Sequence, residues 1–252
     1  MNTEKFTGKA SIYEKYRPEY PKAFIDYLYR DMGFNTSSVI ADIGSGTGIM
    51  SKQLLDRGSI VYGVEPNEDM RKKAENTLNH YGNYTSIAGT AENTMLSDKF
   101  ADFITVAQAF HWFDVIAFKR ECARILKPEG LVVLVWNSRV VDSAQVMENA
   151  EVCKKYCPEF KGFSGGTEGM TERISDFFNS SYQELCFENN ISYDLEGFIG
   201  RNLSASYAPT EKQPGFDEFV KAIIKLFDKY SVNGRLTLPN LTRCYIGKVL
   251  NG

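Results

Sequence analysis

The stretch Val39-Ile-Ala-Asp-Ile-Gly-Ser-Gly-Thr-Gly48 decides the fold of this chain. Its first half is short and mostly apolar, as expected for a buried strand, and residues 47–57 then repeat apolar side chains at helical spacing. Three alternate glycines stand between the two patterns. Glycine adopts positive φ values and lacks the Cβ atom that would keep a ligand away from the backbone. The stretch therefore predicts a strand, a turn that binds a ligand, and a helix.

The same alternation of strand and helix continues toward the C-terminus. Short apolar runs alternate with amphipathic segments, and Asn67 and Asp114 stand where side chains commonly cap helices. Because the strand segments are apolar throughout, they predict a parallel sheet that is covered by helices on both faces. The predicted strands after the first one are 60–64, 84–88, 102–107 and 131–136.

Beyond residue 136 this regular alternation stops. A helical segment at 141–158 leads into a loop with four glycines within residues 159–170. Specificity commonly resides on segments added to an α/β scaffold, so we expect residues 141–181 to cover the ligand crevice as a lid. The remaining predicted elements are a strand at 182–193, helices at 195–206 and 216–230, and a strand at 235–249 that is broken near Pro239.

The overall composition disfavours several classes of protein. The 252 residues carry 29 basic and 32 acidic side chains, a net charge of −3, so nucleic acid is a disfavoured partner. The longest apolar run, Leu131–Trp136, is far too short to span a membrane, and the polar N-terminus lacks a signal-peptide core; the expected location is the cytoplasm. Five cysteines predict reduced thiols, and with only two histidines beside them we expect no metal site.

Two carboxylates near the glycine turn indicate the class of ligand. Glu65 ends the second predicted strand 23 positions after Asp42 (65 − 42), close to the separation at which an acidic side chain binds ribose hydroxyls. The dinucleotide fingerprint fails, because its third glycine would stand at position 49, which is Ile49. Asp42 would repel a pyrophosphate and favours a cationic ligand. A nucleoside with positive charge, such as S-adenosylmethionine, suits both carboxylates.

Four segments, Val39–Met50, Val64–Pro66, Gly89–Glu92 and Phe100–Asp114, follow one another within residues 38–136. Together they resemble the class I S-adenosylmethionine-dependent methyltransferases. The resemblance implies a Rossmann-like α/β fold: a seven-stranded, mostly parallel sheet with helices on both faces and an antiparallel last strand. An extra helical segment is expected between strands five and six.

The resemblance also assigns cofactor contacts to particular residues. A guanidinium group matches a carboxylate in a bidentate pair, which favours an arginine in the N-terminal arm at the methionine carboxylate. The implied contacts are Arg17 at that carboxylate; Asp42, Gly44, Ser45, Gly46 and Gly48 at the methionine half; Glu65 at the ribose; Pro66 and Met70 beside the adenine; Ala91 and Glu92 at the adenine edge; and Gln108 and Ala109 beneath the methionine.

The stretch Ala109-Phe-His-Trp-Phe-Asp114 resembles a subgroup of small-molecule methyltransferases that includes trans-aconitate methyltransferases. Its place after the fourth strand puts His111 and Trp112 near the transferred methyl group. His111 is either a general base or substrate-orienting donor, or a neutral side chain that holds the loop, and the sequence leaves both open. We expect Trp112 and Trp136 to wall the pocket and Arg139 to meet a carboxylic acid substrate.

We therefore expect a single methyltransferase domain over residues 1–252. Its parts are a helical N-terminal arm at 1–35, a cofactor-binding core at 38–136, the added segment at 141–181 and further strands and helices at 182–252. The expected function is in-line methyl transfer from S-adenosylmethionine to a small molecule such as a carboxylic acid, with S-adenosylhomocysteine as product, by a monomer or homodimer. Two other classes stay open: a protein that binds this cofactor or a related nucleoside without catalysis, and a nicotinamide-dependent oxidoreductase.

Overall fold

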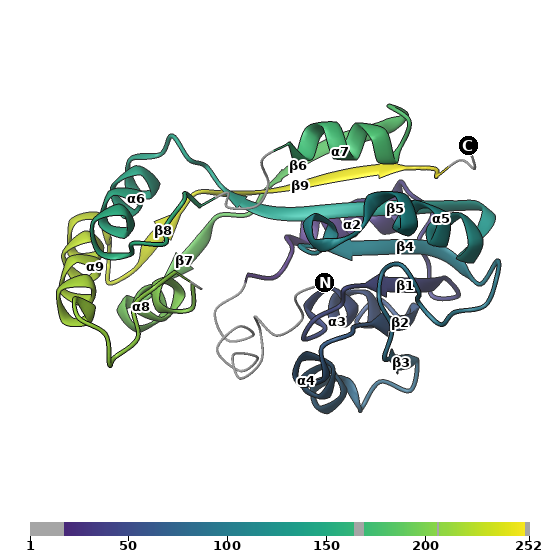
Figure 1. Cartoon of the computed structure of the whole chain (residues 1–252), viewed down its shortest axis with the longest axis horizontal. Coiled ribbons are helices and arrows are strands. Elements are labelled where there is room, and N and C mark those ends of the chain that lie inside the picture. Colours follow the sequence, from purple (N-terminus) through teal and green to yellow (C-terminus); the bar gives the residue numbers. More distant parts are fainter. Residues whose placement is uncertain (1–17, 164–168, 206, 250–252) are drawn as a thin grey trace.

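The structure is a computed structural model that describes residues 18–163, 169–205 and 207–249. These residues form two lobes at opposite ends of the long axis (Figure 1). The lobe that we call the sheet lobe comprises residues 18–139, 170–188 and 240–249. The lobe that we call the small lobe comprises residues 144–163, 191–205 and 207–238.

The sheet lobe is built on a sheet of seven strands within the described residues, in the order β3-β2-β1-β4-β5-β9-β6. Strands β1 to β5 are parallel, whereas β9, the last strand, lies antiparallel between β5 and β6. This confirms the predicted Rossmann-like sheet. The strands are β1 Val39–Ile43, β2 Ile60–Val64, β3 Tyr84–Ile87, β4 Ala101–Ala107, β5 Leu126–Arg139, β6 Tyr182–Glu188 and β9 Asn240–Gly247.

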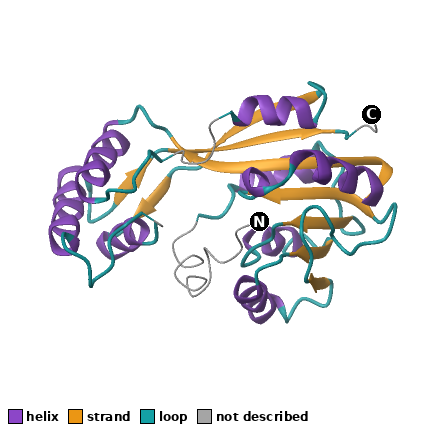
Figure 2. Cartoon of the chain, viewed as in Figure 1, coloured by secondary structure: helices purple, strands orange, loops and turns teal. Residues whose placement is uncertain are grey.

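Helices cover both faces of this sheet (Figure 2), because successive side chains of a strand point to opposite sides. On β5, Val133 and Val135 belong to one apolar core, and Leu134 and Trp136 belong to the other. The helices of the first face are α2 Lys22–Arg30, α3 Ile49–Leu55 and α4 Glu68–Leu78, and those of the second face are α5 Val115–Ile125 and α7 Met170–Phe177.

The small lobe has an apolar core of its own. Three helices pack against an antiparallel ribbon of two strands, and Phe198 and Phe219 are fully buried between them. The predicted helices in these regions are confirmed. The elements are α6 Ala144–Tyr156, β7 Ile191–Tyr193, α8 Leu195–Leu203, α9 Phe216–Tyr230 and β8 Leu236–Leu238.

The prediction of a single strand at residues 182–193 is wrong. β6 pairs with β9 in the large sheet, whereas β7 pairs with β8 in the small lobe. Asparagines lie where the chain passes from β6 to β7. The backbone amide of Asn189 donates to the Asn240 carbonyl at 2.8 Å, and the backbone amide of Asn240 donates to Oδ1 of Asn190 at 3.3 Å. Asparagine side chains compete with the hydrogen bonds of a sheet, so the ladder changes partner here. The predicted break near Pro239 is confirmed.

The added segment 141–181 is divided between the lobes. Helix α6 buries Val146 and Cys153 in the core of the small lobe, whereas α7 buries Ile174 and Phe177 in the core of the sheet lobe. Its two helices therefore contribute to two different cores. The roles of this segment as a lid and of the whole chain as one domain stay predictions.

Candidate functional site

The turn after β1 depends on the space around its three glycines, all of which have positive φ. A Cβ atom at Gly44 would lie 2.6 Å from Cβ of Ala109, and one at Gly48 would lie 2.7 Å from Cδ1 of Leu78. A Cβ atom at Gly46 would meet no atom of the described residues within 4 Å. Gly44 and Gly48 therefore allow close packing of the turn, whereas Gly46 borders space in which a ligand can lie.

Asp42 lies in β1, two residues before Gly44, and is fully buried. Its carboxylate accepts hydrogen bonds from the hydroxyl of Ser51 in α3 at 2.6 Å and from that of Thr105 in β4 at 2.8 Å. Burial raises the pKa of Asp42 to about 6, although the two hydroxyl hydrogen bonds oppose this rise. The side chain thus ties the helix after the turn to the sheet.

Glu65 follows β2 and lies beside the same turn, with 9% of the residue exposed. Its Oε2 accepts from the Gly46 amide at 3.0 Å, and its Oε1 accepts from the Asn67 amide at 2.8 Å. Burial raises the pKa of Glu65, the two backbone hydrogen bonds and Arg71 oppose the rise, and the charge of Asp42 adds to it. Two amides therefore orient this carboxylate next to the space at Gly46.

The start of α4 holds the residues predicted beside the adenine. Asn67 caps the helix by accepting from the Met70 amide at 3.0 Å, and Met70 is buried. Pro66 is half-buried, and its carbonyl and that of Glu65 both accept hydrogen bonds from Arg71. Pro66 and Met70 are thereby held next to Glu65, which is the arrangement that the prediction requires.

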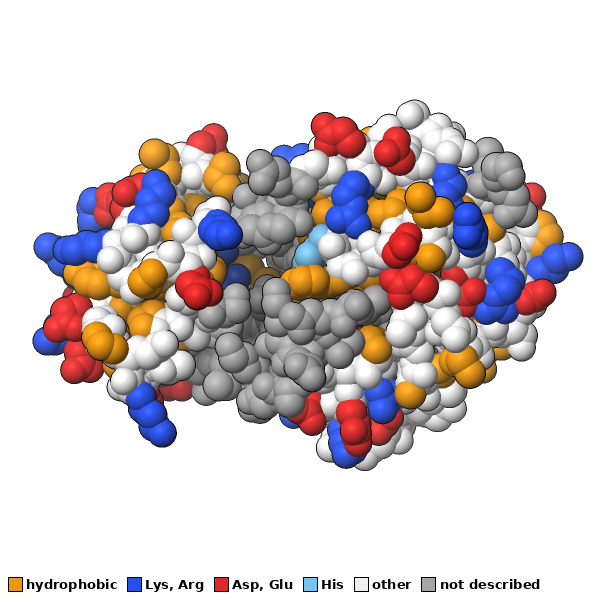
Figure 3. All heavy atoms as spheres, in the orientation of Figure 1, with side chains coloured by type: hydrophobic (Ala, Val, Ile, Leu, Met, Phe, Trp, Pro, Cys, Tyr) orange, Lys and Arg blue, Asp and Glu red, His pale blue; other side chains and the backbone are white. Residues whose placement is uncertain are grey.

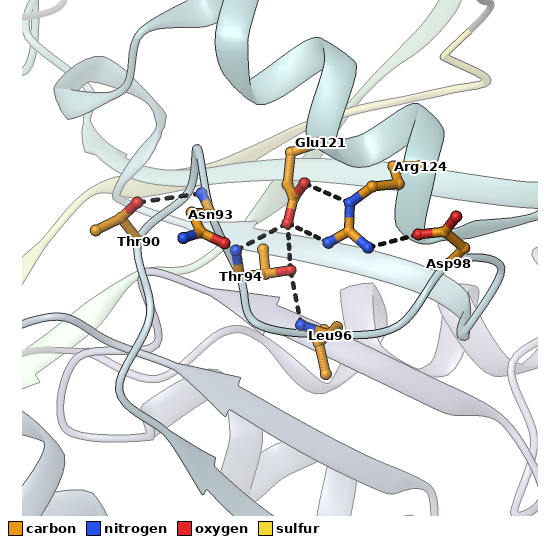
Figure 4. A network of polar contacts seen from close by, with 7 residues as sticks. All are labelled: Thr90, Asn93, Thr94, Leu96, Asp98, Glu121 and Arg124. Atoms are coloured by element: carbon orange, nitrogen blue, oxygen red, sulfur yellow. Dashed lines mark hydrogen bonds and ion pairs between the residues drawn. The ribbon is translucent and has the colours of Figure 1, made fainter.

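The loop from β3 to β4, which carries Ala91, is fastened to α5. Figure 4 shows Glu121 of α5 directed at this loop, where its Oε1 accepts from the amide and the hydroxyl of Thr94 at 2.8 and 2.6 Å. Arg124 donates two hydrogen bonds to the same carboxylate and one to Asp98. Burial by itself would raise the pKa of Glu121, but Arg124 and Thr94 outweigh it and lower that pKa.

Gln108 and Ala109 leave the carboxyl end of β4. Gln108 has a positive φ of 60°, its backbone amide donates to the Val135 carbonyl at 2.9 Å, and its side chain donates to the Asn137 carbonyl at 3.1 Å. Ala109 is buried against Gly44. The ends of β1 and β4 therefore meet, as expected at the point where the strand order of such a sheet reverses.

The residues after Ala109 form a turn of 3-10 helix, η2 (Phe110–Trp112). The rings of His111 and Trp112 lie 4.7 Å apart, and Trp112 is 39% exposed. Glu92 of the preceding loop accepts from the Asp114 amide at 3.0 Å, which links the predicted adenine edge to this turn. The structure thus brings the predicted cofactor segments and the predicted acceptor residues to one end of the sheet.

A family model described as a methyltransferase domain matches residues 41–134 of the chain. The matched range contains the glycine turn, Glu65, the loop with Ala91 and the η2 turn. Residues 41–134 are thus similar to a methyltransferase domain.

Individual proteins agree with this assignment. An uncharacterized methyltransferase of Mycobacterium tuberculosis is 35% identical over 147 residues, which is 58% of each chain, so the match spans little more than half of that relative. An uncharacterized methyltransferase of Schizosaccharomyces pombe is 25% identical over 252 residues and 95% of each chain. The solved structure of a protein of Anaeromyxobacter dehalogenans, assigned as a type II methyltransferase, has a similar fold, with a TM-score of 0.65, 19% identity and coverage of 94% of this chain and 99% of that one.

Beyond residue 134, β5 leads from the sheet lobe toward the small lobe. Trp136 is buried in the sheet-lobe core, with ring centroids 6.3 Å from Phe110 and 6.0 Å from Tyr245, so it lies under the η2 turn. Arg139 ends the strand, and its guanidinium carbon lies 4.0 Å from the ring centroid of Phe163. Arg139 therefore stands where the two lobes join.

Asn137 belongs to the same junction, and the sequence analysis did not identify it. Its Nδ2 donates to the carbonyls of Pro18 and Glu19 at 3.2 and 3.3 Å, and its Oδ1 accepts from Thr242 and Asn189. An amide side chain directly after a buried apolar run was the available signal. Asn137 holds the chain that precedes α2 against the carboxyl end of β5.

Thr47 is a second residue that the sequence analysis missed. Its hydroxyl and that of Ser45 are buried in the glycine turn, and neither has a hydrogen-bond partner in the part of the chain that the structure describes. A hydroxyl between two glycines of a ligand-binding turn was the available signal, because buried polar groups require partners. Arg17, predicted at the methionine carboxylate, lies outside the described residues.

On the face that Figure 3 shows, the sheet lobe and the small lobe both carry acidic and basic side chains. These side chains are interspersed, without a broad region of one sign among the described residues. None of the helices in the described ranges is both long and apolar enough to cross a membrane. This face thus offers no electrostatic footprint typical of a nucleic-acid site.

Proposed function

We propose that the protein is an S-adenosylmethionine-dependent methyltransferase that acts on a small molecule. The observation that carries this proposal is the Glu65 carboxylate, which two backbone amides hold beside the space at Gly46. A carboxylate with further acceptor capacity can bind both hydroxyls of a ribose. The match to a methyltransferase domain supports S-adenosylmethionine as the nucleoside.

The residues around the turn suit a cationic nucleoside that has no phosphates. Asp42 and Glu65 are both buried, and the charge of Asp42 contributes to the raised pKa of Glu65. A cation beside Gly46 would relieve this repulsion, whereas a pyrophosphate would increase it.

The acceptor is proposed to lie between the η2 turn and the junction of the lobes. When bound, the cofactor supplies a methyl group on a positively charged sulfur. His111 and Trp112 line the acceptor side and exclude water, which is the main task of a protein in an in-line displacement. His111 takes a proton where the acceptor is a hydroxyl or an amine, whereas a carboxylate acceptor needs no base. Arg139 pairs with an acidic acceptor.

Calorimetry with S-adenosylhomocysteine tests the cofactor assignment. We expect Glu65→Gln to weaken binding at least tenfold, because the amide loses the charge and one acceptor oxygen; a hydrogen bond to a charged group contributes about 1.5–3 kcal/mol. The matched control is Glu68→Gln, which removes an exposed carboxylate paired with Lys72 and leaves the affinity within twofold. Tighter binding of a nicotinamide dinucleotide than of S-adenosylhomocysteine would contradict the proposal.

A methyl-transfer screen tests catalysis itself. S-adenosylhomocysteine release is followed with small carboxylic acids, phenols and amines as acceptors, and turnover of any of them supports the proposal. A protein that binds the cofactor product and methylates none of these acceptors would instead be a binding protein. For an acidic acceptor, we expect Arg139→Ala to raise the KM of the acceptor about tenfold at unchanged cofactor affinity. An unchanged KM of the acceptor in this variant would refute the role of Arg139.

A further inference from the structure

Arg173, in the middle of helix α7, contacts the backbone of the η2 turn. Its Nη2 donates to the Phe113 carbonyl at 2.9 Å, and its Nη1 donates to the His111 carbonyl at 3.4 Å. Its guanidinium carbon also lies 5.8 Å from the ring centroid of Phe110. A single side chain, half-buried and 60 positions away in sequence, thus holds two carbonyls of the turn.

The His111 carbonyl is one that a short helix leaves for other partners, and the Phe113 carbonyl belongs to the residue that follows the helix. Within the turn, the Ala109 carbonyl accepts from the Trp112 amide at 2.9 Å, and the Phe110 carbonyl accepts from the Phe113 amide at 3.1 Å. The last carbonyls of a helix have no partner within it. The planar fork of a guanidinium donates to two oxygens at once, which fixes direction as well as distance.

The residues that flank His111 and Trp112 also pack on the glycine turn. A Cβ atom at Gly44 would lie 2.6 Å from Cβ of Ala109 and 3.2 Å from Cζ of Phe113. The segment that carries His111 and Trp112 is therefore in contact both with Gly44 and with Arg173. Its position relative to the glycine turn depends on both contacts.

Helix α7 has other contacts with the rest of the sheet lobe, so its position does not depend on Arg173 alone. The ring of Phe177 stacks on that of Phe118 at 5.4 Å between centroids, with 9° between the planes. Lys119 of α5 donates to the Asp176 carbonyl at 2.9 Å and to Oδ1 of Asn179 at 2.6 Å. These contacts hold the helix at its C-terminal end, where the Phe177 ring also lies 5.1 Å from the ring of Phe110 between centroids.

We propose that Arg173 is a positioning residue that fixes the η2 turn, and with it His111 and Trp112, against the glycine turn. The inference rests on the proposed function for its catalytic consequence. The α7 part of the added segment is then a support behind the acceptor side of the site. A displacement of about 1 Å at reacting groups lowers a rate by up to a hundredfold, so the loss of this support affects turnover more than cofactor binding.

Hydrogen exchange of the turn is the direct test. We expect Arg173→Met to raise the exchange rates of the Trp112 and Phe113 amides about tenfold, because these amides open when the turn loses its carbonyl partners. Lys119→Met is the matched control, since it removes contacts of α7 that do not reach the turn, and it leaves these rates unchanged. Arg173→Lys keeps the charge but not the double fork, and we expect a smaller increase.

Kinetics give the second readout, with an acceptor from the methyl-transfer screen. We expect Arg173→Met to lower kcat about tenfold with the affinity for S-adenosylhomocysteine within threefold of wild type, and Arg173→Lys to restore part of the rate. Unchanged exchange at the turn in both Arg173 variants, or an equal increase in Lys119→Met, would overturn the inference. Absence of turnover in the wild type would count against the proposed function alone, because the exchange experiment needs no acceptor.

Discussion

The sheet lobe takes most of its strands and the turns between them from one continuous stretch, residues 39–139, whereas the small lobe gathers its core from two stretches that strand β6 and helix α7 separate in the sequence. In the sheet lobe, β1, β2 and β4 are each followed by a helix that returns the chain to the neighbouring parallel strand. Such connections are short and have a fixed hand, so the order of the elements nearly determines the fold. In the small lobe, amphipathic helices show which face is buried but not against which partner.

The two lobes also differ in the predicted site residues that they contain. All predicted cofactor residues that the structure describes lie in the sheet lobe, and the small lobe meets the site at the contact of Phe163 with Arg139. We therefore expect cofactor binding to depend on the sheet lobe, while the junction of the lobes serves the acceptor. Six substitutions, apart from one control, test this division and the parts of the sheet lobe that form the site, beginning with the largest expected effect.

The largest effect is expected from Phe219→Ala in the core of the small lobe. Removing a fully buried phenylalanine costs about 3–5 kcal/mol. Both tryptophans, Trp112 and Trp136, lie in the sheet lobe, so fluorescence follows that lobe and circular dichroism follows both. We expect an earlier loss of part of the dichroism in urea, with the fluorescence midpoint and the affinity for S-adenosylhomocysteine unchanged.

The matched variant in the sheet lobe is Phe118→Ala, which removes an equally buried ring that contacts Phe113 at 4.9 Å between centroids. Here the fluorescence midpoint should fall and S-adenosylhomocysteine should bind more weakly, because Phe113 packs on Gly44. Equal losses of fluorescence midpoint in Phe219→Ala and Phe118→Ala would show that the two lobes unfold as one unit.

Gly44→Ala and Gly46→Ala separate packing from ligand space within the turn. Both have positive φ, which costs an L-residue about 1–2 kcal/mol, but only the Cβ at position 44 overlaps a neighbour, Ala109. We expect urea unfolding to show a loss of about 3 kcal/mol for Gly44→Ala and about 1 kcal/mol for Gly46→Ala. Calorimetry should show weaker S-adenosylhomocysteine binding in Gly46→Ala; unchanged affinity there would place the ligand elsewhere.

Asp42→Asn tests the buried carboxylate behind the turn through the pH dependence of stability. The pKa of Asp42 is raised to about 6 in the folded protein, from 3.8, so between these values the folded state holds a proton that the unfolded state releases. The stabilising contribution of the wild-type carboxyl is therefore complete below about pH 4 and is lost as the pH rises through 6. The free energy of unfolding of wild type, relative to Asp42→Asn, should fall on the order of 2–3 kcal/mol from pH 4 to 7. A constant difference in urea melts across this range would contradict the expectation.

The smallest effect is expected from Glu121→Gln, in the network that fastens the loop with Ala91 to α5. The glutamine keeps an oxygen for Thr94 but loses the charge that Arg124 pairs with, which costs about 1–2 kcal/mol at this buried site. The control is Asp98→Asn, whose side chain is 74% exposed and whose ion pair with Arg124 contributes about 0.5 kcal/mol or less. Chemical unfolding compares the two, and a larger loss in Asp98→Asn would refute the ranking.

The comparison of sequence and structure follows the same division between lobes. The glycine turn, Glu65 and the apolar strands were readable because their spacing is local and their residue types have few alternatives. Two of the residues that were missed act over long distances: Asn137 joins β5 to Pro18 and to Thr242, and Arg173 reaches the η2 turn from another helix. No local sequence pattern predicts a side chain whose hydrogen-bond partner is a distant backbone carbonyl.

The interrupted strands show the same limit. The predicted strand at 182–193 has continuous strand character, yet it divides at Asn189 because the partner strand divides beside it at Asn240. Strand propensity depends on the neighbours that a strand meets, and the sequence of one strand does not contain its neighbours.

The amino-acid sequence alone determined the order of strands and helices, the glycine turn and the acidic residue that follows the second strand. Local backbone preferences and the alternation of buried and exposed positions depend on residues that are neighbours in the chain, so they can be inferred from the sequence. Only the tertiary structure decided that Asp42 is enclosed by Ser51 and Thr105, that the added segment is shared between two cores, and that Arg173 supports the turn with His111. These features depend on burial and on contacts between distant segments, which exist only once the chain has folded.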